Sequence, residues 1–133
     1  MKEITYTKTT GIPPRSMEEE FLCHKRGFEW WYATGFLNDE NGRLFTFQFT
    51  LSKIKVYGVT FNLLMTAVTD IDNAKHYYNQ KSIFFEKDVV ITSSRVGVEG
   101  AAEMTFPLDK SGGGRLGLTM DGDGYALTLD IDM

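Results

Sequence analysis

The chain has 133 residues, of which 42% are apolar and 24% charged, a composition typical of a folded globular protein and not of a disordered one. A chain of this length forms one domain and buries roughly two-thirds of the surface that it exposes when unfolded. Its formal net charge is −4 and its isoelectric point is about 5.1. Because binding to a phosphate backbone needs a basic face, nucleic acids are not expected as partners.

Cys23 is the only cysteine, which excludes an internal disulfide and any metal site built from several cysteines. A lone cysteine fits a reducing compartment. The first ten residues contain no apolar segment of the kind found in signal peptides, and no apolar run approaches the roughly 20 residues of a membrane span. We therefore expect a soluble protein with no membrane span, and the cytoplasm is the favoured compartment.

Residues 1–22 show little periodicity and are expected to form an irregular N-terminal arm that contains Gly11 and the Pro13-Pro14 pair. One helical turn is expected from Ser16 to Phe21, because Ser16 and Glu19 have the spacing of a capping box. The remaining residues, 23–133, are expected to form the single domain.

Alternation of apolar and polar residues begins at Phe28 and continues through most of the chain. Because successive side chains of a strand point to opposite faces, this period of two predicts β-strands. Three long strands are expected at 28–36, 44–51 and 59–69. The residues that share a face are Phe28, Trp30, Tyr32, Thr34 and Phe36 in the first strand, Phe45, Phe47, Phe49 and Leu51 in the second, and the inward-facing Phe61, Leu63, Met65 and Ala67 in the third.

Shorter alternating segments follow, separated by turn residues such as Asp121-Gly122-Asp123-Gly124. About nine short strands at regular spacing, without a helix of more than ten residues, predict an antiparallel sandwich or barrel. The six shorter strands are expected at 75–79, 82–86, 89–92, 102–106, 115–120 and 125–131.

A resemblance to the AttH/CrtC family of hydroxyneurosporene synthase-like proteins rests on four segments. They are Glu29-Trp30-Trp31-Tyr32-Ala33-Thr34-Gly35-Phe36-Leu37, Gly42-Arg43-Leu44-Phe45, Phe47-Gln48-Phe49-Thr50 and Ala67-Val68-Thr69-Asp70. The resemblance covers residues 24–132 and implies an all-β fold, an antiparallel lipocalin-like barrel. Family members pair two such domains, handle apolar molecules and include carotenoid 1,2-hydratases. This chain resembles the first half alone, so no catalytic residue is carried over from the family.

The adjacent residues Trp30 and Trp31 must point to opposite faces of their strand. If Trp30 fills the barrel, Trp31 lies on the outside, where an exposed indole beside other apolar groups marks a contact surface. Trp31 is therefore the candidate residue for a partner interface. The alternatives are that the N-terminal arm covers it, or that it contacts a second lipocalin-like domain or another copy of this chain in a homo-oligomer.

An apolar small molecule is the expected ligand of such a barrel, with aromatic side chains lining its cavity. A filled core is the alternative, and small barrels favour it. Glu29 could act as a buried acid in an apolar site, or it could make a structural hydrogen bond or salt bridge at the barrel mouth. The candidate ligand-binding residues are Glu29, Trp30, Tyr32, Phe47, Phe49, Phe61 and Met65.

Other patterns in the sequence do not predict a site. Residues 112–117 match the G-x-G-x-x-G motif, but a dinucleotide site also needs a preceding strand and a following helix, and here polar residues precede and a strand follows. The neighbours Cys23 and His24 diverge on an extended chain, and His76 is expected at the surface. No metal site and no cofactor are therefore expected.

Three functions remain open from the sequence. The first is a binding module, a lipocalin-like domain that holds a small apolar molecule such as an isoprenoid, polyene or lipid. The second is one half of a two-domain hydratase or cyclase, with acid–base residues supplied by the other half. The third is an assembly domain with a filled barrel.

Overall fold

The computed structural model describes residues 27–84, 86–106 and 115–132, and these form an almost entirely β-stranded domain. Their only helical segment is a single 3-10 turn, so none of them belongs to a helix that could cross a membrane. The predicted N-terminal arm at 1–22, with its helical turn, lies outside the described residues. The elements are β1 (Phe28–Asn38), β2 (Leu44–Val56), β3 (Val59–Asp70), β4 (Lys75–Ile83), η1 (Glu86–Asp88), β5 (Val89–Ile91), β6 (Arg95–Val98), β7 (Ala102–Thr105), β8 (Arg115–Gly122) and β9 (Tyr125–Asp132).

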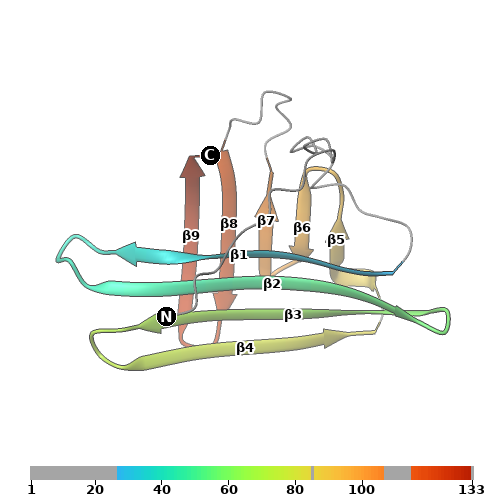
Figure 1. The fold of residues 1–133 in the computed structure, drawn as a ribbon, viewed down its shortest axis with the longest axis horizontal. Helices are drawn as coiled ribbons and strands as arrows, with labels where there is room; N and C mark the ends of the chain where they lie inside the picture. The colour runs from blue at the N-terminus through green and yellow to red at the C-terminus, as the bar shows by residue number, and fades with distance from the viewer. Residues whose placement is uncertain (1–26, 85, 107–114, 133) are drawn as a thin grey trace, which may run out of the picture.

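The strands form two antiparallel sheets in which each strand pairs with its neighbour in sequence. The first sheet has the order β1-β2-β3-β4 and the second the order β5-β6-β7-β8-β9. The two sheets lie face to face, and the long strands of the first sheet cross those of the second (Figure 1). Tight turns join the strands where glycines adopt positive φ, as at Gly42 (φ 77°) and Gly58 (φ 82°).

The expected antiparallel all-β fold is confirmed, but the barrel is not closed. Within the described strands, β1 pairs only with β2 and β4 only with β3, so no backbone hydrogen bonds join the two sheets. The number of strands agrees with the prediction because two differences offset each other. Gln80 and Lys81, which separate the predicted strands 75–79 and 82–86, belong to the continuous edge strand β4. The four-residue strand β6 was not predicted, because it is too short to show a clear alternation.

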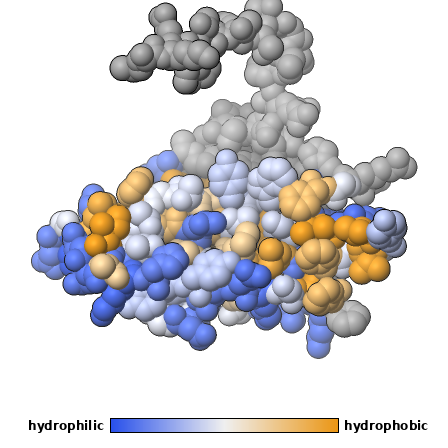
Figure 2. Space-filling model, turned by 60° about the horizontal axis from the view of Figure 1, so that its bottom comes forward, coloured by the Kyte–Doolittle hydropathy of each residue, from blue (hydrophilic) through white to orange (hydrophobic). Residues whose placement is uncertain are grey.

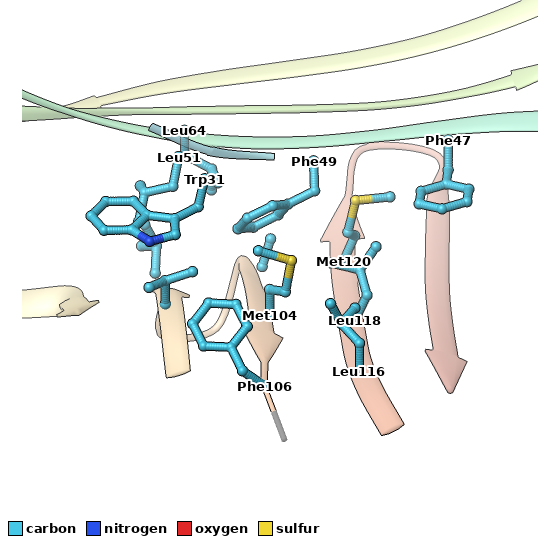
Figure 3. Packing of buried hydrophobic residues seen from close by; sticks show 13 residues of the cluster. Trp31, Phe47, Phe49, Leu51, Leu64, Met104, Phe106, Leu116, Leu118 and Met120 are labelled. Carbon is cyan, nitrogen blue, oxygen red and sulfur yellow. The ribbon is translucent and has the colours of Figure 1, made fainter. Parts of the chain in front are cut away.

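A filled hydrophobic core lies between the sheets. Trp31, Phe47 and Phe49 of the first sheet point toward Met104, Leu118 and Met120 of the second (Figure 3). Phe49, Leu51 and Leu118 have no exposed surface at all. The core also contains Trp31, Phe47 and Leu64 from the first sheet and Val96, Val98, Met104, Phe106, Leu116 and Met120 from the second.

The register of the first sheet reverses the expected orientation of two strands. Trp31 pairs with Leu51 and is 7% exposed in the core, whereas Trp30 is 55% exposed on the face turned away from the second sheet. The expectation that Trp31 lies outside is therefore wrong. On β3 the inward side chains are those of Asn62, Leu64 and Thr66, so the expected inward set of Phe61, Leu63, Met65 and Ala67 points outward.

On β1 the physical reason is that both faces carry apolar side chains, whereas on β3 the inward face is the more polar one, with Asn62 and Thr66 beside Leu64 and Val68. A shift of one residue exchanges the two faces of a strand, and hydrophobicity alone does not choose between them when both are apolar. The inward set on β2 was predicted correctly because the other face of β2, with Thr46, Gln48 and Thr50, is polar.

Candidate ligand-binding site

A pocket of about 440 Å³ opens between the two sheets at one end of the sandwich, and we call it the mouth pocket. At this end the strands of the first sheet extend past β9 (Figure 1). The walls of the mouth pocket are formed by Leu37, Phe45, Val68, Tyr77, Tyr125, Ala126 and Leu127, and its rim by Asn38, Asp39, Arg43, Asp70 and Gly124.

The walls of the mouth pocket come from the last two inward-facing rows of the first sheet. Leu37 pairs with Phe45, which in turn pairs with Asp70. Val68 pairs with Tyr77 in the next row. Because paired residues share a face of a sheet, these apolar side chains form one continuous surface that faces β9.

An ion pair between Arg43 and Asp70 closes one side of the rim. Asp70 also accepts hydrogen bonds from Asn73 Nδ2 at 2.8 Å and from the Asn73 backbone N–H at 3.1 Å. The Asn73 side chain, followed by the Asn73 backbone and Arg43, lowers the pKa of Asp70 below its usual value of 3.8 despite an opposing effect of burial. The Asp70 carboxylate therefore stays ionised near neutral pH and is no proton donor.

The guanidinium of Arg43 lies over an aromatic ring of the pocket wall. Its Cζ atom is 5.1 Å from the ring centroid of Phe45, a geometry that attracts a cation to the face of the ring. The backbone N–H of Arg43 donates to Asp39 Oδ1 at 2.8 Å, and so does that of Asn41 at 2.9 Å. These contacts hold the β1–β2 turn in one conformation at the rim.

The opposite wall is the β8–β9 hairpin, which packs on β4. The rings of Tyr77 and Tyr125 are tilted to one another with centroids 6.3 Å apart. Gly124 has φ +90°, and a Cβ atom there would lie 2.9 Å from Tyr77 Cδ1, so only glycine allows this approach. The Tyr125 hydroxyl is hydrogen-bonded to Thr66 Oγ1. The hairpin is thereby fixed to the first sheet.

A second pocket of about 430 Å³, more polar than the mouth pocket, is lined in part by Thr66, Asn79 and Asp121. Buried Asn79 Nδ2 has no hydrogen-bond partner among the described residues, and neither has either polar side-chain atom of Asn62, which is 1% exposed. Asn62 lies in the interior but lines neither pocket.

The predicted ligand-binding residues are distributed over three regions, and none of them lines the mouth pocket. Phe47 and Phe49 belong to the filled core (Figure 3). Trp30, Tyr32 and Met65 come together, but in a shallow depression of about 380 Å³ on the outward face of the first sheet.

The other two predicted residues lie apart from these groups. Phe61 is also on the outward face, where its ring stacks on that of Phe84 with centroids 5.9 Å apart. Glu29 is half-buried on the inward face, directly opposite Lys53 in the register. A ligand-binding role for the seven predicted residues stays a prediction.

The residues of the mouth pocket were not predicted because they lie at the ends of strands beside turns. Leu37, Phe45 and Val68 continue the period-two pattern of their strands. Only for Phe45 on β2 did this pattern predict the correct face of the sheet. These residues line one pocket with Leu127 because the second sheet crosses the first, and a local sequence pattern does not predict how two sheets cross. Within residues 27–84, 86–106 and 115–132 no group of three or more His, Cys, Asp or Glu residues could hold a metal ion.

The two sheets and their filled core define a lipocalin-like antiparallel β fold. It is similar to the crystal structure, at 2.00 Å resolution, of a protein provisionally assigned as AttH from Nitrosomonas europaea, with a TM-score of 0.71 and 18% sequence identity. The match covers 93% of this chain and 39% of that chain, so this chain spans well under half the length of its structural neighbour. At this identity the likeness shows an AttH-like fold alone. No family model matches the sequence, and no curated protein matches it.

Proposed function

We propose that the domain binds a small apolar molecule in the mouth pocket. The observation that carries this proposal is an apolar interior behind a polar rim in which Arg43 and Asp70 form an ion pair. A volume of about 440 Å³ lies within the range of about 300–1,000 Å³ that small-molecule pockets occupy. The core behind the pocket is filled, so the ligand enters at the open end and does not pass through the domain.

The rim favours a ligand whose polar end carries no negative charge. Arg43 and Asp70 neutralise each other, which leaves the carboxylate of Asp39 as an additional negative charge at the rim. Among the residues that line the pocket Arg43 is the only cation, and it is already paired with Asp70, so an anionic head group would meet the negative charge of Asp39. A hydroxyl end group, by contrast, can donate to a rim carboxylate or accept from Arg43. The proposed ligand class is therefore a neutral isoprenoid, polyene or lipid alcohol.

The groups around the pocket support binding more than catalysis. A general acid must carry a proton near neutral pH, and Asp70 does not, because its pKa is lowered. The Tyr125 hydroxyl is engaged with Thr66. We assign no catalytic residue to this chain.

Retinol is a suitable probe because it joins an apolar polyene to a neutral hydroxyl. Its fluorescence is expected to rise on addition of protein and to saturate at one retinol per chain. Val68→Trp fills the mouth pocket from one wall and is expected to abolish the rise. Thr119→Trp, which adds the same indole at an exposed position of β8, serves as the matched control and is expected to bind like the wild type. Retinoic acid tests the head group and is expected to bind more weakly.

Equal retinol binding by Val68→Trp and the wild type would place the ligand elsewhere. Circular dichroism and thermal melting show whether the variant is folded. If Val68→Trp does not fold, Leu127→Gln tests the same pocket from β9 by making its wall polar.

The length of the structural neighbour favours a second candidate function. Because the match spans 39% of that chain, we infer that the domain is one unit of a larger two-domain architecture, as in a hydratase or cyclase of apolar substrates. The mass of the single polypeptide, measured under denaturing conditions on protein isolated from its natural source, tests this candidate. A mass of 15.1 kDa would contradict it, and a mass near twice that value would support it.

A further inference from the structure

The face of the first sheet that is turned away from the second sheet, here called the outer face, carries no Asp, Glu, Lys or Arg. All four strands are described in full, and the register places each of their charged residues on the other face. Sheet faces in contact with water are usually polar and charged, whereas the cores of protein interfaces are depleted of charge. The six charged residues on the inward side are Glu29, Lys53, Lys55, Asp70, Lys75 and Lys81.

Large aromatic side chains occupy the outer face in place of charges. Phe28, Trp30, Tyr32 and Phe36 follow one another along β1 and are between 54% and 74% exposed. Hydrophobic side chains also gather at the end of the molecule where β2 joins β3, on the right in Figure 2. Exposed apolar area of this extent is uncommon on a monomer and marks a binding surface.

Several hydroxyl and amide groups of the outer face are hydrogen-bonded to their neighbours. Gln48 Nε2 donates to Thr50 Oγ1 at 3.3 Å, and the Tyr78 hydroxyl donates to Gln80 Oε1 at 2.8 Å. Thr34 Oγ1 donates to the backbone carbonyl of Phe47 at 3.0 Å. Because these groups keep their hydrogen bonds when water leaves, covering the face with another apolar surface costs little.

A shallow depression of about 380 Å³ lies on the outer face, lined by Trp30, Tyr32 and Thr34 of β1 and by Gln48, Thr50 and Met65. The exposed rings of Phe28 and Phe36 lie on the same strand, on either side of these β1 residues. In a symmetric dimer the same patch of both copies is in contact, so exposed side chains of one copy can enter the depression of the other. We infer that the outer face binds a second copy of this chain.

Size and charge agree with this partner. Four strands about 4.8 Å apart, with about 3.3 Å per residue, give the outer face an extent on the order of 700 Å². A stable interface buries about 800 Å² on each partner. Each chain has a net charge of −4, so a dimer needs a contact surface that adds no like-charge repulsion, and the outer face is such a surface.

Analytical ultracentrifugation of the full chain tests the inference. The wild type is expected to sediment with twice the 15.1 kDa mass of the chain and to dissociate on dilution. Tyr32→Glu and Tyr32→Lys each place like charges across the interface and are expected to yield monomers at concentrations where the wild type is dimeric. Mixing the two variants brings opposite charges together and is expected to restore the dimer mass. Thr119→Lys, at an exposed position of the second sheet, is the matched control and is expected to remain dimeric.

A wild type that stays monomeric up to millimolar concentration would overturn the inference, as would a dimer that both Tyr32 variants leave intact. Restoration by the mixed variants excludes misfolding as the cause of dissociation. Because the mouth pocket lies between the sheets and away from the outer face, loss of the dimer is expected to leave retinol binding in place. Failure of this inference is thereby distinct from failure of the proposed function.

Discussion

Trp30 and Trp31 are adjacent in the chain and belong to different environments. Trp31 is 7% exposed and packs in the core between the sheets (Figure 3). Trp30 is 55% exposed on the outer face, where its ring centroid lies 5.1 Å from that of Phe28. The same strand, β1, thus places one indole in the core and a second indole on the surface.

Replacement of the two tryptophans is expected to have very different effects on stability. Trp31→Ala removes a large buried side chain and is expected to lower the free energy of unfolding by about 3–5 kcal/mol. Trp30→Ala removes a half-exposed side chain and is expected to lower it by less than about 1 kcal/mol. Urea denaturation of both variants, at a concentration where the wild type is monomeric, measures the difference. Equal losses would contradict the register of β1.

The stability that Asp70 contributes is expected to depend on pH. Because its pKa is lower in the folded protein than its usual value of 3.8, this contribution is present above pH 3.8 and is lost as the pH falls through the folded-state pKa. Asp70→Asn is therefore expected to destabilise the protein at neutral pH, and the difference from the wild type is expected to narrow below pH 3.8.

Thermal melts of the wild type and Asp70→Asn over this pH range show whether the stability difference narrows or grows as the pH falls. Asp130→Asn is the control, because Asp130 is exposed on β9. A difference between wild type and Asp70→Asn that grows as the solution becomes more acidic would contradict the assignment of Asn73 and Arg43 as the stabilising partners.

Gly97→Ala in β6 is expected to destabilise the second sheet. A Cβ atom at this position would lie 2.3 Å from the carbonyl oxygen of Ala102 and 2.6 Å from Glu103 Cα, both of which are backbone atoms that cannot move aside alone. Overpacking of this kind costs about 1–3 kcal/mol or more.

Gly117→Ala is the matched control for Gly97→Ala. Its Cβ atom would approach the Thr105 hydroxyl at 2.5 Å, and that side chain can rotate away. Guanidinium denaturation is expected to rank Gly97→Ala well below Gly117→Ala in stability, and the reverse order would show that β6 and β7 are not as closely packed as the structure has them.

The sequence was sufficient to predict the all-β fold, and it was insufficient to predict which side of two strands is buried. Phe45 to Leu51 alternate cleanly with polar residues, so the inward face of β2 could be read directly. The second face of β1 carries Trp31, Ala33 and Leu37, so both of its faces are apolar and the more aromatic one is not the one that is buried.

On β3 the prediction was wrong for a different reason, because polar residues are buried there. Asn62 and Thr66 face inward, and Thr66 does so because Tyr125 supplies a hydrogen bond from a strand nearly sixty residues later in the chain. The mouth pocket depends on the same long-range relationship, since Val68 and Leu127 meet only when the sheets cross. Period-two patterns predict each strand separately and do not predict which residues of the two sheets come into contact.

Native mass spectrometry on protein purified without detergent and mixed with retinol tests the central claim most directly. The account predicts one retinol per 15.1 kDa chain in the wild type and in Thr119→Trp, and none in folded Val68→Trp. A wild-type chain that carries no retinol, or a folded Val68→Trp that carries as much as the wild type, would contradict binding in the mouth pocket.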